Sequence, residues 1–282
     1  MEIADLTKKR IIEYLDEKKR FDKRKLLEYR NIKIRFGISK QAEGSASVRI
    51  GKTEVVAGVK LDIAEPYTDS PDKGSMMVTT ELLPLASEKF EAGPPRINAI
   101  ELSRIVDRGI RESGFIDFKK LCIKKGEKIW MVFIDIYPLN DDGNLIDTSF
   151  LAAVSALRDA FFPKMDEKKE KVEYGKLTEK KLPLKEMPFM LTIHKIGKSI
   201  ILDPITEEEE SSEARVSFAI SPEKKEAIIN AIQKGGEKEL TKKEVFEIID
   251  VAIGEWKRIY PTIVEKITEA EKRPEEKIIQ SG

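Results

Sequence analysis

The middle of the chain contains a strand, a tight turn and a helix of small residues in direct succession. Residues 130–136 are apolar except for Asp135; Asp142 and Gly143 give a turn signal, and residues 152–157 are mainly alanine and other small residues. An Asp-Gly pair favours a tight turn because glycine adopts backbone angles that other residues avoid. This order predicts a buried strand that leads through the turn into a tightly packed helix, within an α+β protein.

Composition limits the classes of function that the chain can serve. Its 282 residues are enough for a sizeable core, as one large domain or two smaller ones. Lys plus Arg and Asp plus Glu both number 51, so the formal net charge is zero and a globally basic nucleic-acid binder is not indicated. Binding of nucleic acid would require a local cationic patch. The charged fraction of 36%, mostly Lys and Glu, suggests a protein from a heat-loving organism.

The chain has one cysteine, Cys122, and one histidine, His194. A single cysteine excludes an intramolecular disulfide and a cysteine-rich zinc site, and we expect Cys122 to be a buried structural thiol. His194 alternates with Ile193, so we expect it on the polar, solvent-facing side of a strand. The sequence contains no glycine-rich phosphate-binding loop. Because we see no signal peptide and no apolar run of membrane-spanning length, we expect a soluble cytoplasmic protein.

Sequence patterns divide the chain into an N-terminal helix (1–20), a first lobe (21–186) and a second lobe (187–282). In the first lobe they predict strands at 31–38, 46–50, 53–61, 78–85 and 128–138 and helices at 98–113 and 148–162. Residues 164–186, rich in Lys and Glu, form either a solvated hairpin or a boundary between the lobes. In the second lobe the patterns predict strands at 189–196, 199–202 and 214–220 and helices at 222–235 and 241–271, the last kinked or interrupted at Pro261.

The predicted helix at 98–113 has an apolar face and a basic face. Its apolar positions recur at helical spacing: Leu102, Ile105, Val106, Gly109 and Ile110. Arg104, Arg108 and Arg111 lie within about 60° of one another on the opposite side. They form either a track for RNA phosphates, or a solvated face in which Asp107 pairs with Arg111 and Arg108 pairs with Glu112. No aromatic residue lies among these arginines, so any RNA binding should be independent of base sequence.

Several motifs together resemble one family. The loop 42–46, the turn Asp142-Gly143, the helix 152–160 and the pair Leu202-Asp203 followed by Glu208-Glu209 resemble RNase PH-type phosphorolytic exoribonucleases. Residues 99–113 and 142–147 look like the non-catalytic RNase PH-like subunit of the archaeal exosome ring. The resemblance runs from about residue 20 to about residue 270. It implies an α+β RNase PH fold of two βα lobes: an N-terminal lobe like domain 2 of ribosomal protein S5 and a smaller C-terminal α/β lobe.

Two positions that are central to catalysis in this family differ here. Active relatives cleave RNA from its 3′ end with inorganic phosphate, which an arginine just after the Asp-Gly turn holds. The resemblance places Ile146 at that position, and an aliphatic side chain cannot bind phosphate. It places Arg215 where active relatives carry an aspartate that acts as general acid or metal ligand, and arginine cannot exchange a proton near neutral pH. The resemblance therefore implies a catalytically inactive chain.

The resemblance also implies partners and a binding surface. A catalytic RNase PH-like paralogue would pair with this chain, three such heterodimers would close a ring, and S1/KH-type cap subunits would bind it. Single-stranded RNA would contact Arg104, Arg108 and Arg111, with Arg96 in the preceding loop as a weaker candidate. We expect no cofactor and no metal, because four adjacent carboxylates at 207–210 are typical of a solvated tract.

Two alternatives stay open at this point. An active phosphate-dependent exoribonuclease would need displaced carboxylates, such as Glu209 or Glu213. A ring-forming scaffold without RNA contacts would leave the arginine helix as a solvated face. The three interpretations differ in whether the chain has an acid in place and in whether its arginines are free to bind.

Overall fold

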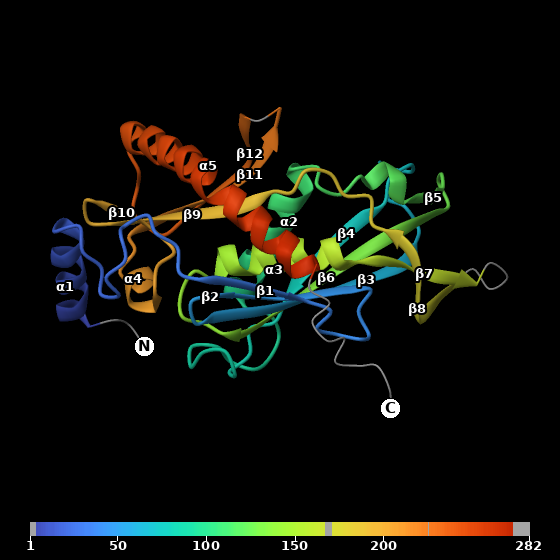
Figure 1. Cartoon of the computed structure of the whole chain (residues 1–282), viewed down its shortest axis with the longest axis horizontal. Helices are drawn as coiled ribbons and strands as arrows, with labels where there is room; N and C mark the ends of the chain where they lie inside the picture. The colour runs from blue at the N-terminus through green and yellow to red at the C-terminus, as the bar shows by residue number, and fades with distance from the viewer. Residues whose placement is uncertain (1–3, 167–170, 225, 273–282) are drawn as a thin grey trace.

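The computed structural model describes residues 4–166, 171–224 and 226–272. These residues form two β-sheets with helices packed against them, and a hairpin projects at one end (Figure 1). The predicted α+β class is thereby confirmed. Residues 1–3 and 273–282, which belong to the expected first and last segments, lie outside the described residues. None of the described helices combines the length and the apolarity that a membrane span requires.

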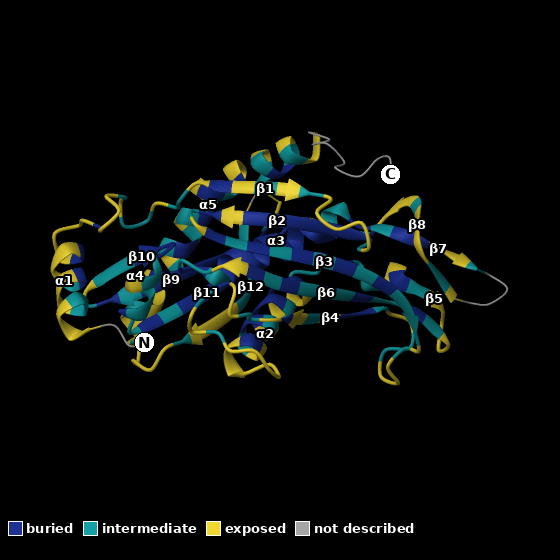
Figure 2. Ribbon diagram, turned by 90° about the horizontal axis from the view of Figure 1, so that it is seen from below, coloured by how far each residue is buried: buried dark blue, intermediate teal, exposed yellow. Residues whose placement is uncertain are grey.

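The first sheet has six strands. Its order is β1 (Ile32–Phe36), β2 (Gly44–Ile50), β3 (Thr53–Ala64), β6 (Lys128–Asn140) and β4 (Ser75–Thr80), with β5 (Cys122–Lys124) beside β6 (Figure 2). Strand β4 is parallel to β6, and the other pairs are antiparallel. The strand expected at 78–85 begins and ends earlier than predicted, because it pairs in parallel register with Met131–Ile136 of β6.

Helix α3 (Leu145–Asp159) lies at the centre of the core. Every residue from Ile146 to Leu157 is buried, and the helix contacts β2 and β3 of the first sheet as well as β9 (Phe189–Ile196) of the second. A Cβ on Gly44 of β2 would lie only 2.5 Å from the carbonyl oxygen of Ala156. The absence of a side chain at this glycine therefore allows the close approach of helix and sheet that the sequence predicts.

Strands β7 (Phe161–Asp166) and β8 (Lys171–Lys181) form the projecting hairpin, at the end of the molecule opposite to α1 (Asp5–Asp16). The hairpin interpretation of the segment 164–186 is confirmed, and residues 167–170 at its tip lie outside the described residues. The helix expected at 148–162 ends at Asp159, because Phe161 already belongs to β7.

The second sheet is antiparallel, in the order β10 (Ser199–Leu202), β9, β11 (Ala214–Glu223) and β12 (Glu226–Gly235). Strands β9 and β10 have the predicted bounds. The helix expected at 222–235 is wrong, because most of this segment is strand β12 paired with β11. Adjacent apolar residues such as Ile228 and Ile229 fit either period, so periodicity could not separate helix from strand.

Helix α5 (Lys242–Lys272) runs as one continuous helix past both sheets. Its buried face consists of Ile248, Ala252, Trp256, Ile259, Ile263 and Ile267. The expected interruption at Pro261 is not observed. Pro261 and Lys257, whose carbonyl loses its helical partner there, are both exposed, so water can solvate that carbonyl.

His194 is buried, contrary to the expectation that it faces solvent. Its strand, β9, contacts both α3 and α5, and residues of α1 pack against Ile196 near its end. The Nδ1 atom of His194 lies 3.2 Å from the hydroxyl of Ser212. Burial, followed by the nearby charge of Arg215, lowers the pKa of His194 to about 3. Cys122, expected to be buried, is half-buried at the start of β5.

Candidate functional site

The Asp-Gly turn lies where the two lobes meet, between the end of β6 and the start of α3. Gly143 has a φ of +80°, and a Cβ there would lie 2.5 Å from the carbonyl oxygen of Pro204. Asn144 follows with a φ of 59°, and its Nδ2 donates to Asp203 Oδ1 at 2.8 Å. The turn is therefore pressed against residues 203–206 of the second lobe, in a conformation that glycine permits.

Ile146, where the resemblance predicts the loss of a phosphate-binding arginine, lies in the core rather than in an open site. Ile146 is only 9% exposed and belongs to the hydrophobic core. Two residues before Ile146, the backbone nitrogen of Asn144 donates a hydrogen bond to Glu209 Oε2 at 3.2 Å. Burial, reinforced by the neighbouring Asp141, raises the pKa of Glu209 to about 7. A carboxylate of the chain itself thus occupies the start of α3, where backbone N–H groups favour anions.

Three arginines from the segment before β1 bind carboxylates of the second lobe. The fully buried Asp203 accepts hydrogen bonds from Arg30 Nε at 2.8 Å, from Arg30 Nη2 at 2.7 Å and from Arg24 Nη1 at 3.0 Å. Arg20 pairs with Glu208, which is also buried. Because these buried charges are paired and hydrogen-bonded, they join the lobes rather than form an open binding site.

Sequence reasoning missed this network. The segment 18–30 reads only as rich in Lys and Arg, and its partners lie far along the chain, beyond any local pattern. The one usable signal is the presence of arginine at positions 20, 24 and 30, because its planar guanidinium suits bidentate contacts with buried carboxylates.

The acidic run 207–210 is not the solvated tract that we expected. It lies in the short helix α4 (Thr206–Glu210), in which Glu208 is buried against Arg20. Glu209 binds the backbone of Asn144, and Glu210 pairs with Lys89. Within the part of the chain that the structure describes, no group of three His, Cys, Asp or Glu side chains is placed to hold a metal ion.

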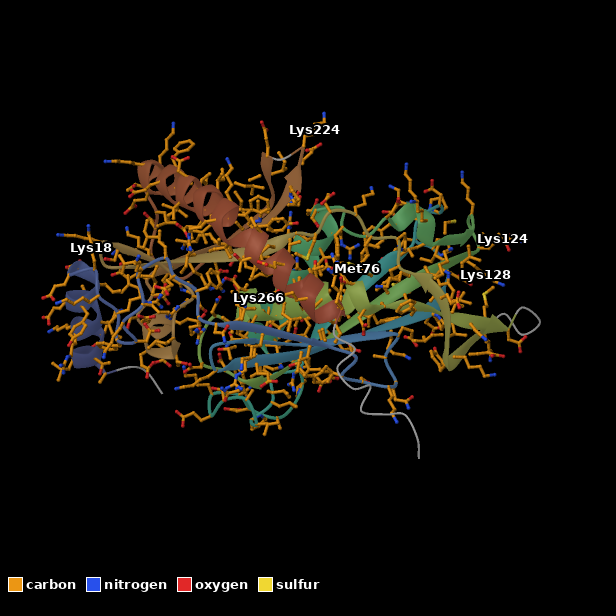
Figure 3. All side chains as sticks on the ribbon, in the orientation of Figure 1. Lys18, Met76, Lys124, Lys128, Lys224 and Lys266 are labelled. Carbon is orange, nitrogen blue, oxygen red and sulfur yellow. The ribbon has the colours of Figure 1, made fainter. Side chains whose placement is uncertain are left out.

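The second candidate site is a groove of about 720 Å³ beside α2 (Ile97–Glu112). Arg104, Arg108 and Arg111 are exposed, and all three line it. Edge strand β4, with Met76 labelled in Figure 3, and Gln233 of β12 also contribute to the lining. The structure therefore brings together the three arginines that the sequence places on one face of the helix.

Arg111 and Arg96 are held by neighbouring groups. Arg111 donates to both carboxylate oxygens of Asp107, at 3.0 and 2.7 Å, and to the carbonyl oxygen of Met76 at 3.1 Å. The expected pair of Asp107 with Arg111 is confirmed. Arg96 lies apart from the groove, in a smaller hollow of about 230 Å³ before α2, and pairs with Glu91. The structure thus separates Arg96 from the other three candidates.

Arg104 and Arg108 have no partner in the part of the chain that the structure describes. Across residues 4–166, 171–224 and 226–272, neither takes part in an ion pair or a hydrogen bond. The expected pair of Arg108 with Glu112 is therefore wrong for this structure. Each guanidinium keeps five N–H donors available to an anion in the groove.

Arg215 directs its guanidinium toward α2. It lies on β11, and its Nη2 donates to Glu101 Oε1 at 2.7 Å. Glu101 lines the same groove as Arg104. Gly235, the partner of Arg215 across β11 and β12, leaves room for this side chain, because a Cβ there would lie 2.6 Å from Arg215 Cζ. Position 215 thus supplies a cation that binds the arginine helix.

The fold and these sites agree with one family of proteins. Residues 28–163 match domain 1 of the 3′ exoribonuclease family, and residues 186–255 match its domain 2. The chain therefore belongs to this family, of the RNase PH type. The expected two-lobed RNase PH fold is confirmed.

Relatives and solved structures place the resemblance more closely. Exosome complex component Rrp42 of Methanothermobacter thermautotrophicus is 42% identical over 251 residues, which are 89% of this chain and 92% of that protein. The Methanosarcina acetivorans component of the same name is 44% identical over 89% of this chain and 91% of its own.

A structure of the Archaeoglobus fulgidus exosome with RNA bound to the active site is 40% identical, with a TM-score of 0.81, over 92% of this chain and 98% of that one. An archaeal exosome core is 36% identical, with a TM-score of 0.77, over 92% of this chain and 96% of the other. The predicted resemblance to the archaeal exosome branch is confirmed.

Proposed function

We propose that this chain is a non-catalytic subunit of an archaeal exosome core ring. It binds RNA and structures the active site of a catalytic RNase PH-like partner, which degrades RNA from its 3′ end with phosphate. The relatives support this assignment through their shared name, exosome complex component. The observation that carries it is the contrast between two sites: a turn whose adjacent cation, Arg30, is bound to Asp142 and Asp203, and a groove in which Arg104 and Arg108 have no partner among the described residues.

The groove suits the backbone of single-stranded RNA. Arg104 and Arg108 offer charge-assisted hydrogen bonds to phosphate oxygens, and Arg111 adds charge while it remains bound to Asp107. The residues that line the groove include no aromatic side chain, so bases have no stacking surface there. Binding is therefore governed by phosphate contacts and is independent of base sequence.

The assembly is part of the same proposal. The chain pairs with a catalytic paralogue, three such pairs close a ring, and S1/KH-type cap subunits bind the ring in the cytoplasm. Ring closure brings the groove arginines of the three pairs together and concentrates their positive electrostatic potential along the RNA path. This accounts for RNA binding by a chain without net charge.

One observation favours the alternative of an active enzyme. The pKa of Glu209, raised to about 7, is suitable for a general acid near neutral pH. Against it, the same carboxylate is hydrogen-bonded at the start of α3, and the adjacent Ile146 offers phosphate no cation. Glu213, the other displaced carboxylate, is paired with Lys238 at 2.6 Å.

A phosphorolysis assay tests the proposal. The full chain is purified alone and together with its catalytic RNase PH-like paralogue, and release of nucleoside diphosphates from poly(A) is followed with and without phosphate. We expect phosphate-dependent release by the pair and none by the chain alone. Release by the chain alone, abolished by Glu209→Gln, would establish the alternative of an active enzyme.

A further inference from the structure

We infer that Arg215 is a positioning residue for the RNA-binding groove. By holding Glu101, it prevents Glu101 from pairing with Arg104 and so keeps the Arg104 guanidinium free for a phosphate. This inference rests on the proposed function and adds to it a role for the residue that replaces an acid of active relatives.

The competition between the two arginines follows from helix geometry. Arg104 lies three residues after Glu101 on α2, and side chains at that spacing are neighbours that pair when their charges are opposite. Both line the groove. In the structure Glu101 instead binds Arg215 at 2.7 Å, and Arg104 has no ion-pair partner among the described residues.

Burial explains why Arg215 prevails. Its side chain is 18% exposed, whereas Arg104 is an exposed residue in the groove. A less solvated cation attracts Glu101 more strongly because less water screens the pair. One guanidinium nitrogen of Arg215, Nη1, is buried without a hydrogen-bond partner in the described part of the chain, which costs stability. The stability of β11 alone therefore does not account for an arginine at this position.

The charge of the groove depends on this pair. The lining contains Arg104, Arg108 and Arg111 together with three carboxylates, so the groove on its own has no excess charge. Arg111, which itself lines the groove, neutralises Asp107. Arg215 is not among the residues that line the groove, and it neutralises Glu101. The charges of the lining residues then sum to an excess positive charge.

RNA-binding measurements on the full chain test the inference. The probe is a fluorescein-labelled oligoadenylate, followed by fluorescence anisotropy over a range of salt concentrations. Arg215→Ala should weaken binding about threefold, because Glu101 then pairs with Arg104. It should also lower the slope of log affinity against log salt by up to about 0.7, the loss of one phosphate contact on a single strand.

The decisive variant is the double substitution Arg215→Ala with Glu101→Gln. Removal of the competing carboxylate should restore the affinity and the salt slope of the unmodified chain. A defect that persists in the double variant would overturn the inference, because Arg215 would then act by direct contact or through the fold.

Two further variants complete the test. Gly235→Ala displaces only the flexible end of Arg215, and it should reproduce the Arg215→Ala defect at unchanged melting temperature. Unchanged RNA affinity in that variant would count against the inference.

The double variant Arg104→Ala with Arg108→Ala should lose most of the affinity. If it does while Arg215→Ala binds normally, the inference fails and the proposed function stands. If it binds normally, the RNA-binding function itself fails.

Discussion

Glu209 links the protonation of a single residue to the stability of the junction between the lobes. Its pKa is about 7 in the folded chain, above the ordinary value of 4.5, because the carboxylate is buried beside Asp141. An acid with a raised folded-state pKa contributes stability below its unfolded pKa, and that contribution is lost as pH rises through the folded pKa. For Glu209 the window runs from about pH 4.5 to about pH 7.

Glu209→Gln should therefore remove a pH dependence. Relative to the unmodified chain, the variant should gain about 1–3 kcal/mol of unfolding free energy between pH 5 and pH 8, because glutamine has no proton to lose. Urea denaturation of both proteins at the two pH values measures this. His194 acts in the opposite direction, since its pKa is lowered to about 3, but it is present in both proteins and cancels. An equal stability difference at both pH values would contradict the prediction.

The sequence predicted which residues belong to the site, but it did not predict the side chains with which they pair. The shared face of Arg104, Arg108 and Arg111 could be predicted from the sequence, and the structure brings all three to one groove. The loss of a phosphate-binding arginine at Ile146 stays a prediction. The pairing of Arg215 with Glu101 could not be predicted, because two elements far apart in the chain bring these side chains together. The pairing of Arg24 and Arg30 with Asp203 could not be predicted for the same reason.

At the level of elements, the contact between α3 and β2 sets how closely helix and sheet pack. Gly44→Ala should destabilise the chain by about 1–3 kcal/mol, because the new Cβ would meet backbone atoms that cannot move aside. Gly58→Ala on β3 is the matched control, since its Cβ would lie 3.8 Å from the nearest atom. Chemical denaturation compares the two variants. A loss at Gly58 as large as that at Gly44 would show that glycine matters there for reasons other than space.

Elements with a clear period were predictable, and those decided by pairing were not. Helix α2 matches its predicted bounds closely because one face is apolar at helical spacing, and strands β9 and β10 match because each is a short, mainly apolar run. Strand β12 was mistaken for a helix, since its adjacent isoleucines fit both periods and its pairing with β11 is a tertiary effect. The bounds of β4 likewise depend on β6.

Across the whole molecule, charge is spread widely while the functional charge is local. Lys18 beside α1, Lys224 on the β11–β12 hairpin and Lys124 on β5 lie far apart in Figure 3. Acidic residues balance these cations in number, so net charge carries no information about function. What distinguishes the α2 groove is that Asp107 pairs with Arg111 and Glu101 pairs with Arg215, while Arg104 and Arg108 have no partner among the described residues.

The lobes are joined by a buried ionic contact, so its loss should affect the whole molecule. Asp203→Asn should reduce the unfolding free energy by about 3 kcal/mol, because Arg24 and Arg30 would lose the buried carboxylate that they share and keep only the less buried Asp22 and Asp142. Glu17→Gln, which removes an exposed pair with Lys19, is the control and should leave stability unchanged. Calorimetry of both variants measures the difference. A small loss for Asp203→Asn would indicate that packing of α3 alone holds the lobes together.

The pair of Arg215 with Glu101 also limits which side chains position 215 can accept. An acid at position 215 would face Glu101 without a cation between them, and like charges at that distance repel. If Arg215 keeps Arg104 free as we infer, such an acid would also return Glu101 to Arg104 and weaken RNA binding. Positions 101 and 215 are therefore expected to tolerate changes of charge only when both change together.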